Sequence, residues 1–194
     1  MEIDYCALSP KILSARISKE SGDFMSEEVI DGGLEILKYP NPVLKKKSED
    51  VTVFDEELAV FVKDLFAAMR AHDGVGLAAP QVGVLKKIAV VEYDGKSYVL
   101  INPRVVDQKG LQDGEEGCLS FPGIYAHVTR PQWVKIAAQD ETGEIHEYEA
   151  EGYTARAFLH EMDHLTGKLF VDYLSSLKRN AIKKKAAKKT GGHF

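Results

Sequence analysis

The sequence has few cysteines and no long apolar segment. Only Cys6, near the N-terminus, and Cys118, in mid-chain, occur among its 194 residues. Two cysteines do not make the disulfide framework on which small secreted domains depend, so we expect the chain to work in a reducing cytoplasm. No segment reaches the roughly 20 apolar residues that a membrane-spanning helix needs, and the N-terminus lacks the order of a signal peptide. We therefore expect a cytoplasmic protein with no membrane association.

The chain also lacks the excess of positive charge that favours binding to nucleic acids. The formal net charge is −5 at pH 7, which gives no general attraction to phosphate backbones, and we expect no sequence-specific nucleic-acid binding. Hydrophobic residues, by contrast, make up 44% of the chain. Such a chain can bury one substantial core but is too short to form two domains that each have a core of their own. We therefore expect a single catalytic domain.

The chain is expected to divide into three regions. Residues 1–33 are interpreted as a poorly ordered N-terminal extension, whose acidic residues argue against an organelle transit peptide. Residues 34–177 are expected to form the catalytic domain. Residues 178–194 form a basic tail with many lysines and few apolar residues, for which we expect a solvated helix that frays.

Hydrophobic periodicity predicts an α+β fold. From Asp55 to Met69 apolar residues recur at three- and four-residue steps, which predicts an amphipathic helix that ends near Gly74. A second helix should span about 153–165. Runs of β-branched and aromatic residues predict two antiparallel hairpins, which pair residues 88–93 with 97–101 and residues 133–138 with 145–149.

The segment between these hairpins is less regular. Residues 110–123 are rich in glycine and acids, and we expect a loop or a short irregular strand there. Loops held by a rigid scaffold often carry function, so this segment is a candidate for part of a site.

The strongest chemical signal lies within the second helix. His160 and His164 stand four residues apart, so they share one helix face and can bind one metal ion. Glu161 follows the first histidine directly, and a glutamate so placed accepts a proton from metal-bound water instead of acting as a ligand. The alternative is a pair of ordinary surface histidines, because so short a pattern also arises by chance. The metal interpretation therefore requires a third ligand.

Cys118 is the best candidate for that ligand. Thiolate is a strong donor to divalent transition metals, and Cys6 lies in the expected extension. Gly117 and the polar residues nearby indicate a shaped loop, whereas the alternative is a small buried hydrophobe. Asp163 could compete as a ligand, but its helix position points it away from the two histidines. We interpret Asp163 as structural, for example as the hydrogen-bond partner of a histidine ring.

A third cluster directly follows the first helix. From Gly74 to Gln81 the sequence is Gly-Val-Gly-Leu-Ala-Ala-Pro-Gln, whose small residues permit close backbone approach of a substrate or a neighbouring element. Pro80 fixes the turn that presents the Gln81 amide. The alternative is a tight helix-to-strand connection. A phosphate loop is excluded, because no lysine followed by serine or threonine comes after the glycines.

Together the three segments resemble peptide deformylases. That family carries, in the same order, a Gly-x-Gly-x-Ala-Ala-x-Gln loop, a Glu-Gly-Cys-Leu-Ser segment and a helix bearing His-Glu-x-x-Asp/His. These match residues 74–81, 116–120 and 160–164, and the likeness extends from about Ile36 to Leu177. At Tyr125 some relatives carry an arginine that helps to hold substrate, and the N-terminal extension is longer than is usual in the family.

The resemblance implies a fold and a metal ion. Antiparallel β-hairpins and sheets should pack around a central helix that carries the metal motif, with an N-terminal amphipathic helix and a C-terminal helix. One divalent ion, best interpreted as Fe(II), would be held by Cys118, His160 and His164. Nickel, cobalt or zinc could occupy the site in purified protein.

The resemblance also implies an activity, the removal of the formyl group from the initiator methionine of nascent polypeptides with release of formate. Glu161 would accept a proton and return it to the leaving amine, while the Leu119 N–H and the Gln81 side-chain amide would donate to the oxyanion. The residues implied at the substrate are Gly74, Val75, Gly76 and Gly117. The implied partners are N-formyl-methionyl nascent peptides and, through the basic tail, the ribosome.

Two other functions fit parts of the pattern. A metallopeptidase that cuts internal peptide bonds matches the His-Glu-x-x-His motif alone, but the Cys118 ligand and a formyl-sized site argue against it. In a non-catalytic protein with a closed structural zinc site, Glu161 would have no reason to stand beside the metal. Formate release from formyl-methionyl peptides separates the three functions.

Overall fold

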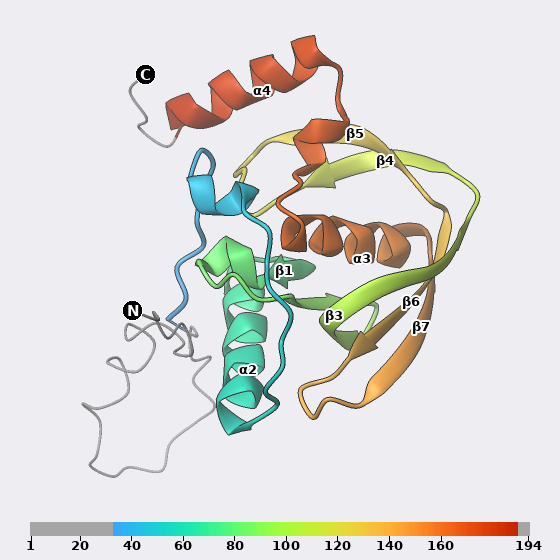
Figure 1. Ribbon diagram of the computed structural model, residues 1–194. Coiled ribbons are helices and arrows are strands. Elements are labelled where there is room, and N and C mark those ends of the chain that lie inside the picture. Colours follow the sequence, from blue (N-terminus) through green and yellow to red (C-terminus); the bar gives the residue numbers. More distant parts are fainter. Residues whose placement is uncertain (1–32, 190–194) are drawn as a thin grey trace, which may run out of the picture.

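The computed structural model describes residues 33–189, with side chains described as far as Ala186. The expected N-terminal extension, Gly33 apart, therefore lies outside the described residues, as does the end of the basic tail. The fold is α+β, as the sequence predicts (Figure 1). The elements, with η for 3-10 helices, are η1 (Pro42–Lys45), α2 (Glu56–Ala71), β1 (Gly76–Ala78), η2 (Ala79–Val82), β2 (Ile88–Tyr93), β3 (Lys96–Lys109), β4 (Gln112–Gly117), β5 (Tyr125–Arg130), β6 (Trp133–Gln139), β7 (Ile145–Glu151), α3 (Gly152–Leu165), η3 (Phe170–Tyr173) and α4 (Ser176–Lys189).

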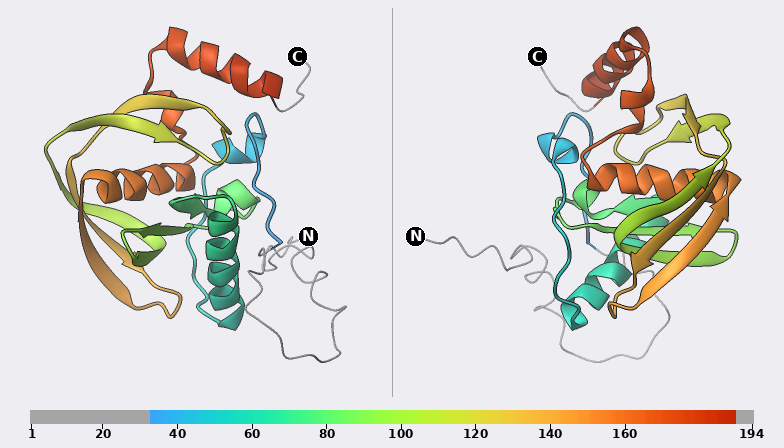
Figure 2. Two further views of the ribbon diagram at one scale, coloured as in Figure 1. Left: turned by 180° about the vertical axis from the view of Figure 1, so that it is seen from behind. Right: turned by 45° about the vertical axis from the view of Figure 1, so that its right-hand side comes forward.

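Two antiparallel sheets enclose helix α3. The larger sheet has the strand order β1-β2-β3-β6-β7, and the smaller one consists of β4 and β5. Helix α3 lies between them, as the views from front and back agree (Figure 2). Its Phe158 and Leu165 belong to a core cluster with Val91, Leu100 and Ile136 of the larger sheet. The helix that carries the histidine motif is thus held at the centre of the domain.

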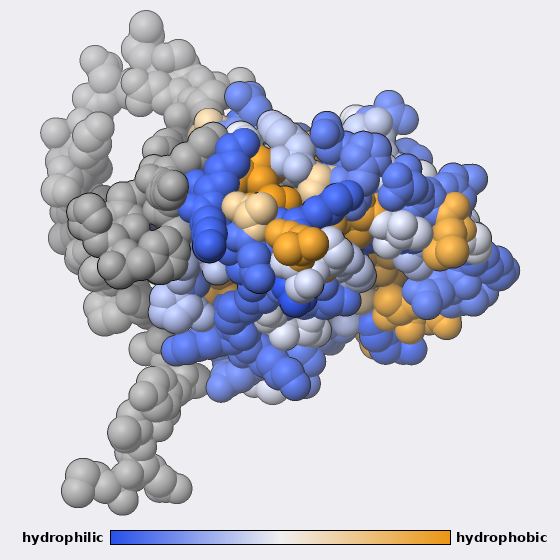
Figure 3. Space-filling view, turned by 90° about the horizontal axis from the view of Figure 1, so that it is seen from above, coloured by the Kyte–Doolittle hydropathy of each residue, from blue (hydrophilic) through white to orange (hydrophobic). Residues whose placement is uncertain are grey.

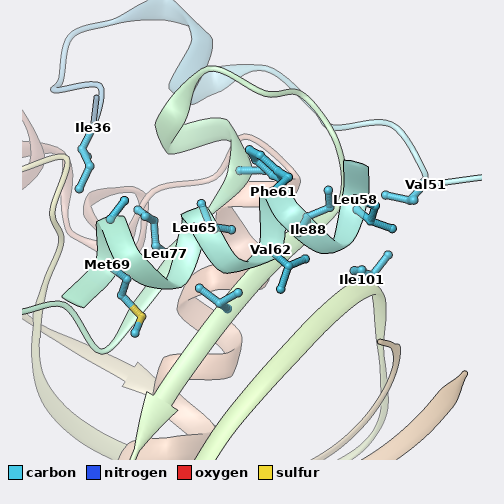
Figure 4. Close-up of a cluster of buried hydrophobic side chains, with 13 residues drawn as sticks. Ile36, Val51, Leu58, Phe61, Val62, Leu65, Met69, Leu77, Ile88 and Ile101 are labelled. Carbon is cyan, nitrogen blue, oxygen red and sulfur yellow. The ribbon is translucent and has the colours of Figure 1, made fainter. Parts of the chain in front are cut away.

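Helix α2 forms where the periodicity predicts it. The Asp55 carboxylate accepts a hydrogen bond of 2.9 Å from the Leu58 N–H and caps the helix, and two glutamates follow in the first turn, where the helix dipole favours negative charge. The apolar stripe of α2 packs against β1 and β2 through the cluster in Figure 4. This packing anchors the start of the segment from Gly74 to Gln81.

Both predicted hairpins are present, although one strand is longer than predicted. Strands β2 and β3 are joined by Asp94 and Gly95, whose φ values of 52° and 71° suit a two-residue turn. Strands β6 and β7 pair as predicted. Strand β3 continues to Lys109 because residues 104–109 pair with β6 across register shifts. All of these residues are exposed, so they lack the buried alternation that marks a strand in a sequence.

Residues 110–123 differ from the prediction of a loop or short irregular strand. Strand β4 is regular and pairs residue by residue with β5. Its acids are accommodated because Asp113 and Glu115 are exposed, while the buried Glu116 forms an ion pair with Arg130 of β5. The irregular part is the short connection after Gly117, and it contains Cys118.

Helix α4 covers most of the basic tail. The sequence predicts a solvated, fraying helix, and the structure contains a helix, but Ile182 and Ala186 pack against a cluster that includes Leu44 and Phe170. The surface on this side of the molecule is otherwise mainly hydrophilic (Figure 3). Within residues 33–189, no helix combines the length and apolar character needed to cross a bilayer.

Candidate metal centre

Three potential metal ligands converge between helix α3 and the connection after β4. The helix presents His160 and His164 from consecutive turns, and the connection presents Cys118. Their donor atoms all lie within 4.8 Å of one another, and Cys118 Sγ is 3.3 Å from His164 Nε2. One thiolate and two imidazoles form a donor set that divalent transition metals prefer. The three residues expected as ligands are therefore brought together.

Burial suits these side chains to a metal ion. His164 is 1% exposed, and burial lowers its pKa well below the ordinary 6.5, so its imidazole is neutral as a ligand must be. Its Nδ1 is a buried nitrogen without a hydrogen-bond partner. For His160, burial alone would lower the pKa, but hydrogen bonds to Cys118 and Glu116 raise it well above 6.5. A proton must therefore leave this pair when a metal binds.

Glu116 orients the ring of His160. The Nδ1 atom of His160 lies 2.9 Å from Glu116 Oε2, and such a contact holds the proton on Nδ1 and leaves Nε2 for a metal. Burial raises the pKa of Glu116, but hydrogen bonds from Arg130 and His160 outweigh it and lower the pKa from 4.5 to about 2. Glu116 is therefore a carboxylate at neutral pH.

Two buried arginines hold Glu116 in turn. Arg130 donates to both carboxylate oxygens at 2.6 and 2.9 Å, and Arg156 donates to Oε1 at 2.8 Å. Such a network leaves the carboxylate little freedom to rotate. Arg130 also donates to Asp163 at 2.7 Å, and the Tyr173 hydroxyl donates to the same carboxylate. Asp163 is therefore structural, as expected, but its partners are these two residues and not a histidine ring.

Glu161 lies beside the ligands and is almost fully buried. It is 4% exposed, and its Oε2 has no hydrogen-bond partner. Burial raises its pKa from 4.5 to about 7, although the charges on His160 and Arg130 oppose the shift. Gly76 allows this position, because a Cβ there would lie 2.4 Å from Glu161 Oε1. A carboxyl group with a pKa near neutrality is suited to accept and release a proton.

Gln81 and Leu119 approach the ligands from two different loops. The Gln81 side chain is fixed at both ends, because its Oε1 accepts from the Ala78 N–H at 2.9 Å and its Nε2 donates to Ser120 Oγ at 3.2 Å. The same Nε2 lies 3.5 Å from Cys118 Sγ. The Leu119 N–H has no acceptor within the described part of the chain. One Gln81 N–H directed at Cys118 Sγ and the N–H of Leu119 therefore lie near the ligands.

One cavity of about 460 Å³ joins these groups. It is lined by every residue predicted for the site except His164, which is buried. The predicted residues that line it are Gly74, Val75, Gly76, Gln81, Gly117, Cys118, Leu119, His160 and Glu161. Tyr125, whose role the sequence leaves open, also lines the cavity and is 62% exposed. Its ring lies over Gly117, where a Cβ would come within 2.6 Å of it.

Sequence reasoning missed the supporting residues of the site. Glu116 lies inside a recognised motif, but nothing in its spacing assigns it to His160. Arg130 and Arg156 are single charges in a strand and a helix, where a charged residue usually faces solvent. Lys38, which also lines the cavity, lies far from the motifs in sequence. A basic residue at an inward position of a strand is a weak signal that would have suggested a buried ion pair.

Known proteins resemble this chain over most of its length. The sequence model of the family described as Polypeptide deformylase matches residues 34–180. Peptide deformylase 1 of Bacillus cereus is 50% identical over 139 residues, which cover 71% of this chain and 89% of that protein. The peptide deformylase of Wolinella succinogenes is 44% identical over 164 residues, which cover 80% and 96%.

Solved structures give the same result. The crystal structure of a peptide deformylase from Legionella pneumophila superimposes with a TM-score of 0.78 at 41% identity and covers 81% of this chain and 95% of that one. The enzyme from Thermotoga maritima has a TM-score of 0.72 at 40% identity, with 73% and 97% covered. The residues matched by the family model include both sheets and helix α3, and the chain belongs to the peptide deformylase family.

Proposed function

We propose that this chain removes the formyl group from the N-terminal methionine of nascent polypeptides and uses the residues of the cavity to do so. The observation that carries the proposal is the position of the buried Glu161 carboxylate beside the donors of Cys118, His160 and His164, at one cavity, in a chain of this family. The reaction is hydrolysis of a formamide, and its products are formate and a free amino terminus.

Cys118, His160 and His164 would hold one divalent metal ion. A bound divalent cation lowers the pKa of a water molecule and polarises a carbonyl oxygen. We propose Fe(II) as the working metal, with nickel, cobalt or zinc as substitutes in purified protein. The thiolate and imidazole donors support a transition metal over magnesium or calcium, which prefer oxygen ligands.

Glu161 would serve both proton transfers. Its carboxylate accepts a proton as water attacks the formyl carbon, and the same carboxyl group passes that proton to the methionine nitrogen as the C–N bond breaks. The pKa of about 7 supports this role, because a group that must both accept and release a proton works best near the ambient pH. Its burial within the cavity keeps bulk water away from the proton in transit.

Gln81 and Leu119 would stabilise the oxyanion that forms when water adds to the formyl carbonyl. The Gln81 Nε2 and the Leu119 N–H are donors fixed in advance near the ligands, and fixed donors need no reorganisation during the reaction. Gln81 is 1% exposed, so its bond to the oxyanion would form away from solvent. Burial strengthens such a bond.

The peptide would lie along β1. This strand is at an edge of the larger sheet, so its outer N–H and C=O groups can pair with an extended peptide. Gly74, Val75 and Gly76 lie at this edge and Gly117 lies at the end of β4, and all four line the cavity. The absence of a side chain at the three glycines supports close approach of the peptide backbone.

Two broader proposals concern the surroundings of the enzyme. The substrate arises where proteins are made, which supports action in the cytoplasm. The lysine-rich α4 supports contact with the ribosome, whose RNA attracts positive charge. Co-sedimentation of the intact chain with ribosomes should fall as salt increases, and no salt-dependent co-sedimentation would count against that contact.

The experiment that tests the main function is formate release from a formyl-methionyl tripeptide by the metal-loaded chain. We expect formate without cleavage of the internal peptide bonds. Internal cleavage would instead identify a metallopeptidase, and a metal-loaded protein without either activity would identify a structural site. An acetylated version of the tripeptide is the control, and we expect it to react far more slowly because the cavity has to accept one further methyl group.

A further inference from the structure

A short segment outside the three motifs connects two of them. We call residues 37–39 the strap, and it belongs to the blue stretch that leads to η1 in Figure 1. The Leu37 N–H donates to the Gln81 carbonyl at 2.7 Å. Lys38 Nζ donates to the Leu119 carbonyl at 2.9 Å, and the Tyr39 N–H donates to the Ser120 carbonyl at 2.9 Å. The strap therefore bonds to both loops that carry the proposed oxyanion donors.

Aromatic packing extends the strap toward the metal ligands. The Tyr39 ring stacks on Phe121, with ring centres 4.9 Å apart. Phe121 meets the edge of Phe170 at 5.3 Å, and the Phe170 ring is stacked near His160 at 6.1 Å. Such packing fixes the strap relative to helix α3, so the backbone that carries the Lys38 side chain is held rigidly.

We infer that Lys38 is a positioning residue for the reaction, which holds Leu119 so that its N–H faces the oxyanion. The inference rests on the proposed function, because it assumes that the Leu119 N–H is an oxyanion donor. The carbonyl and the N–H of Leu119 lie on either side of one Cα, so only the two backbone dihedrals of that residue separate them. An ammonium bonded to the carbonyl restricts both dihedrals.

The chemistry of lysine suits this task. Its ammonium makes a charge-assisted hydrogen bond, which is stronger than a bond between neutral groups. The carbonyl of Leu119 belongs to a connection without regular secondary structure, so no ladder of strand hydrogen bonds holds it. The hydrogen bond from Lys38 of the strap holds the Leu119 carbonyl in place of a strand hydrogen bond. Preorganised donors matter because a misplacement of about 1 Å can cost roughly 100-fold in rate.

The test compares three variants of the intact, metal-loaded chain. Lys38→Met removes the ammonium but keeps an unbranched side chain, and Lys38→Arg restores a charged donor. Lys47→Met is the matched control, because Lys47 is exposed and nearby in the sequence but does not line the cavity. Metal content, melting temperature, kcat and KM for a formyl-methionyl tripeptide, and amide hydrogen exchange over residues 116–121 are measured for each.

We expect Lys38→Met to lower kcat by about 10-fold, the lower limit for a residue that supports a site from outside. KM, metal content and melting temperature should stay at the parent values, and exchange over residues 116–121 should accelerate. Lys38→Arg should recover most of kcat, and Lys47→Met should match the parent throughout. In a Gln81→Leu background, Lys38→Met should cost less than it does alone if both act on the same oxyanion.

Other results overturn the inference. A rise in KM with unchanged kcat would make Lys38 a substrate contact, and a lower melting temperature or metal content would make it structural. An unchanged kcat in Lys38→Met together with a large loss in Gln81→Leu would reject the role of Lys38 and leave the proposed function intact. Absence of formate release from the parent chain would reject the proposed function itself.

Discussion

The Nδ1 atom of His160 lies 2.9 Å from the Oε2 atom of Glu116, and this contact links the metal ligands to the ion pairs inside the domain. Glu116 comes from β4, whereas His160 comes from α3, so the contact also joins the smaller sheet to the central helix. The orientation of His160 and the stability of the fold therefore depend on the same carboxylate.

Glu116→Gln should weaken metal binding and stability together. The amide keeps the size of the side chain, but its neutral oxygen no longer balances Arg130 and Arg156, and leaving a buried charge uncompensated typically costs about 3–5 kcal/mol. Loss of the partner of His160 should lower metal affinity or activity by roughly 10- to 100-fold. Metal titration and thermal unfolding measure the two effects. Glu115→Gln is the control because Glu115 is exposed, and a Glu116→Gln variant that also behaved like the parent would contradict the linkage.

Glu161→Gln and Cys118→Ala should both lose activity, but for different reasons. The first removes the base and keeps every ligand, so we expect full metal content with a loss of about 10² to 10⁴ in kcat. The second removes a ligand, so metal content and activity should fall together. Metal per chain and formate release are measured on the same preparations. Parent-like deformylation by Glu161→Gln, or full metal in Cys118→Ala, would refute the assigned role of that residue.

Oxygen should inactivate the iron-loaded protein. Fe(II) and a cysteine thiolate both oxidise in air, and the first change alters the metal ion whereas the second alters the donor atom of Cys118. We expect anaerobic preparations to keep their activity, aerobic ones to lose it, and nickel replacement to protect it. Side-by-side assays over several hours provide the measurement, with iron content followed throughout. Equal and lasting activity of the iron form under both conditions would rule out an oxygen-sensitive iron site.

The β6–β7 hairpin should contribute stability that depends on pH. Asp140 accepts hydrogen bonds from Thr142, Glu144 and His146, which outweigh burial and lower its pKa from 3.8 to about 2. A depressed pKa stabilises the fold above the unfolded value of 3.8, and this contribution is lost as the pH falls toward 2. The pKa of His146 is raised from 6.5, mainly by its hydrogen bond to Asp140, so its contribution is present below 6.5 and is lost as the pH rises through the raised value.

Asp140→Asn should therefore be less stable than the parent near pH 5, and the difference should shrink as the pH approaches 2. Both groups are partly exposed, so the effect is small. Urea unfolding of both proteins at several pH values gives the difference directly, and acid loss of metal affects both equally. A difference that stayed constant between pH 5 and pH 2 would contradict the pKa shift.

The sequence predicts the parts of this molecule that depend on local pattern. Helix α2 could be predicted because its apolar residues follow one helical stripe. Cys118, His160 and His164 could be named as candidate ligands because three motifs occur together in one order. The regular strand β4 could not be predicted in the same way, because it is stabilised by the ion pair between Glu116 and Arg130, which lies 14 positions away on β5. Local periodicity contains no information about such a partner.

The same limit explains the wrong partner assigned to Asp163. Its position on α3 correctly excludes it as a ligand, but its actual partner Arg130 lies 33 residues earlier in the sequence. Lys38 is more distant still, since 81 residues separate it from Leu119. Contacts across such distances are created by the fold, so the sequence indicates candidate ligands but does not identify the residues that hold them in place.

Gly76 should be required for activity, because Glu161 occupies the space that a side chain at residue 76 would need. A Cβ at residue 76 would lie 2.4 Å from Glu161 Oε1 and 2.8 Å from its Cδ, so Gly76→Ala must displace a carboxylate that is 96% buried and has little room to move. The three ligands are untouched, so we expect parent-like metal content and a loss of roughly 100-fold in kcat, the typical cost of a misplacement of about 1 Å.

A double-mutant cycle distinguishes this cause from a blocked substrate. If Gly76→Ala acts by moving the base, it should cost little in a Glu161→Gln background, because the base is already absent there. If the new methyl group instead obstructs the peptide at β1, KM should rise and the loss should be the same in both backgrounds. Measuring kcat and KM for the parent, the two single variants and the double variant decides between them, and additive losses would show that the close approach of Gly76 to Glu161 has no catalytic consequence.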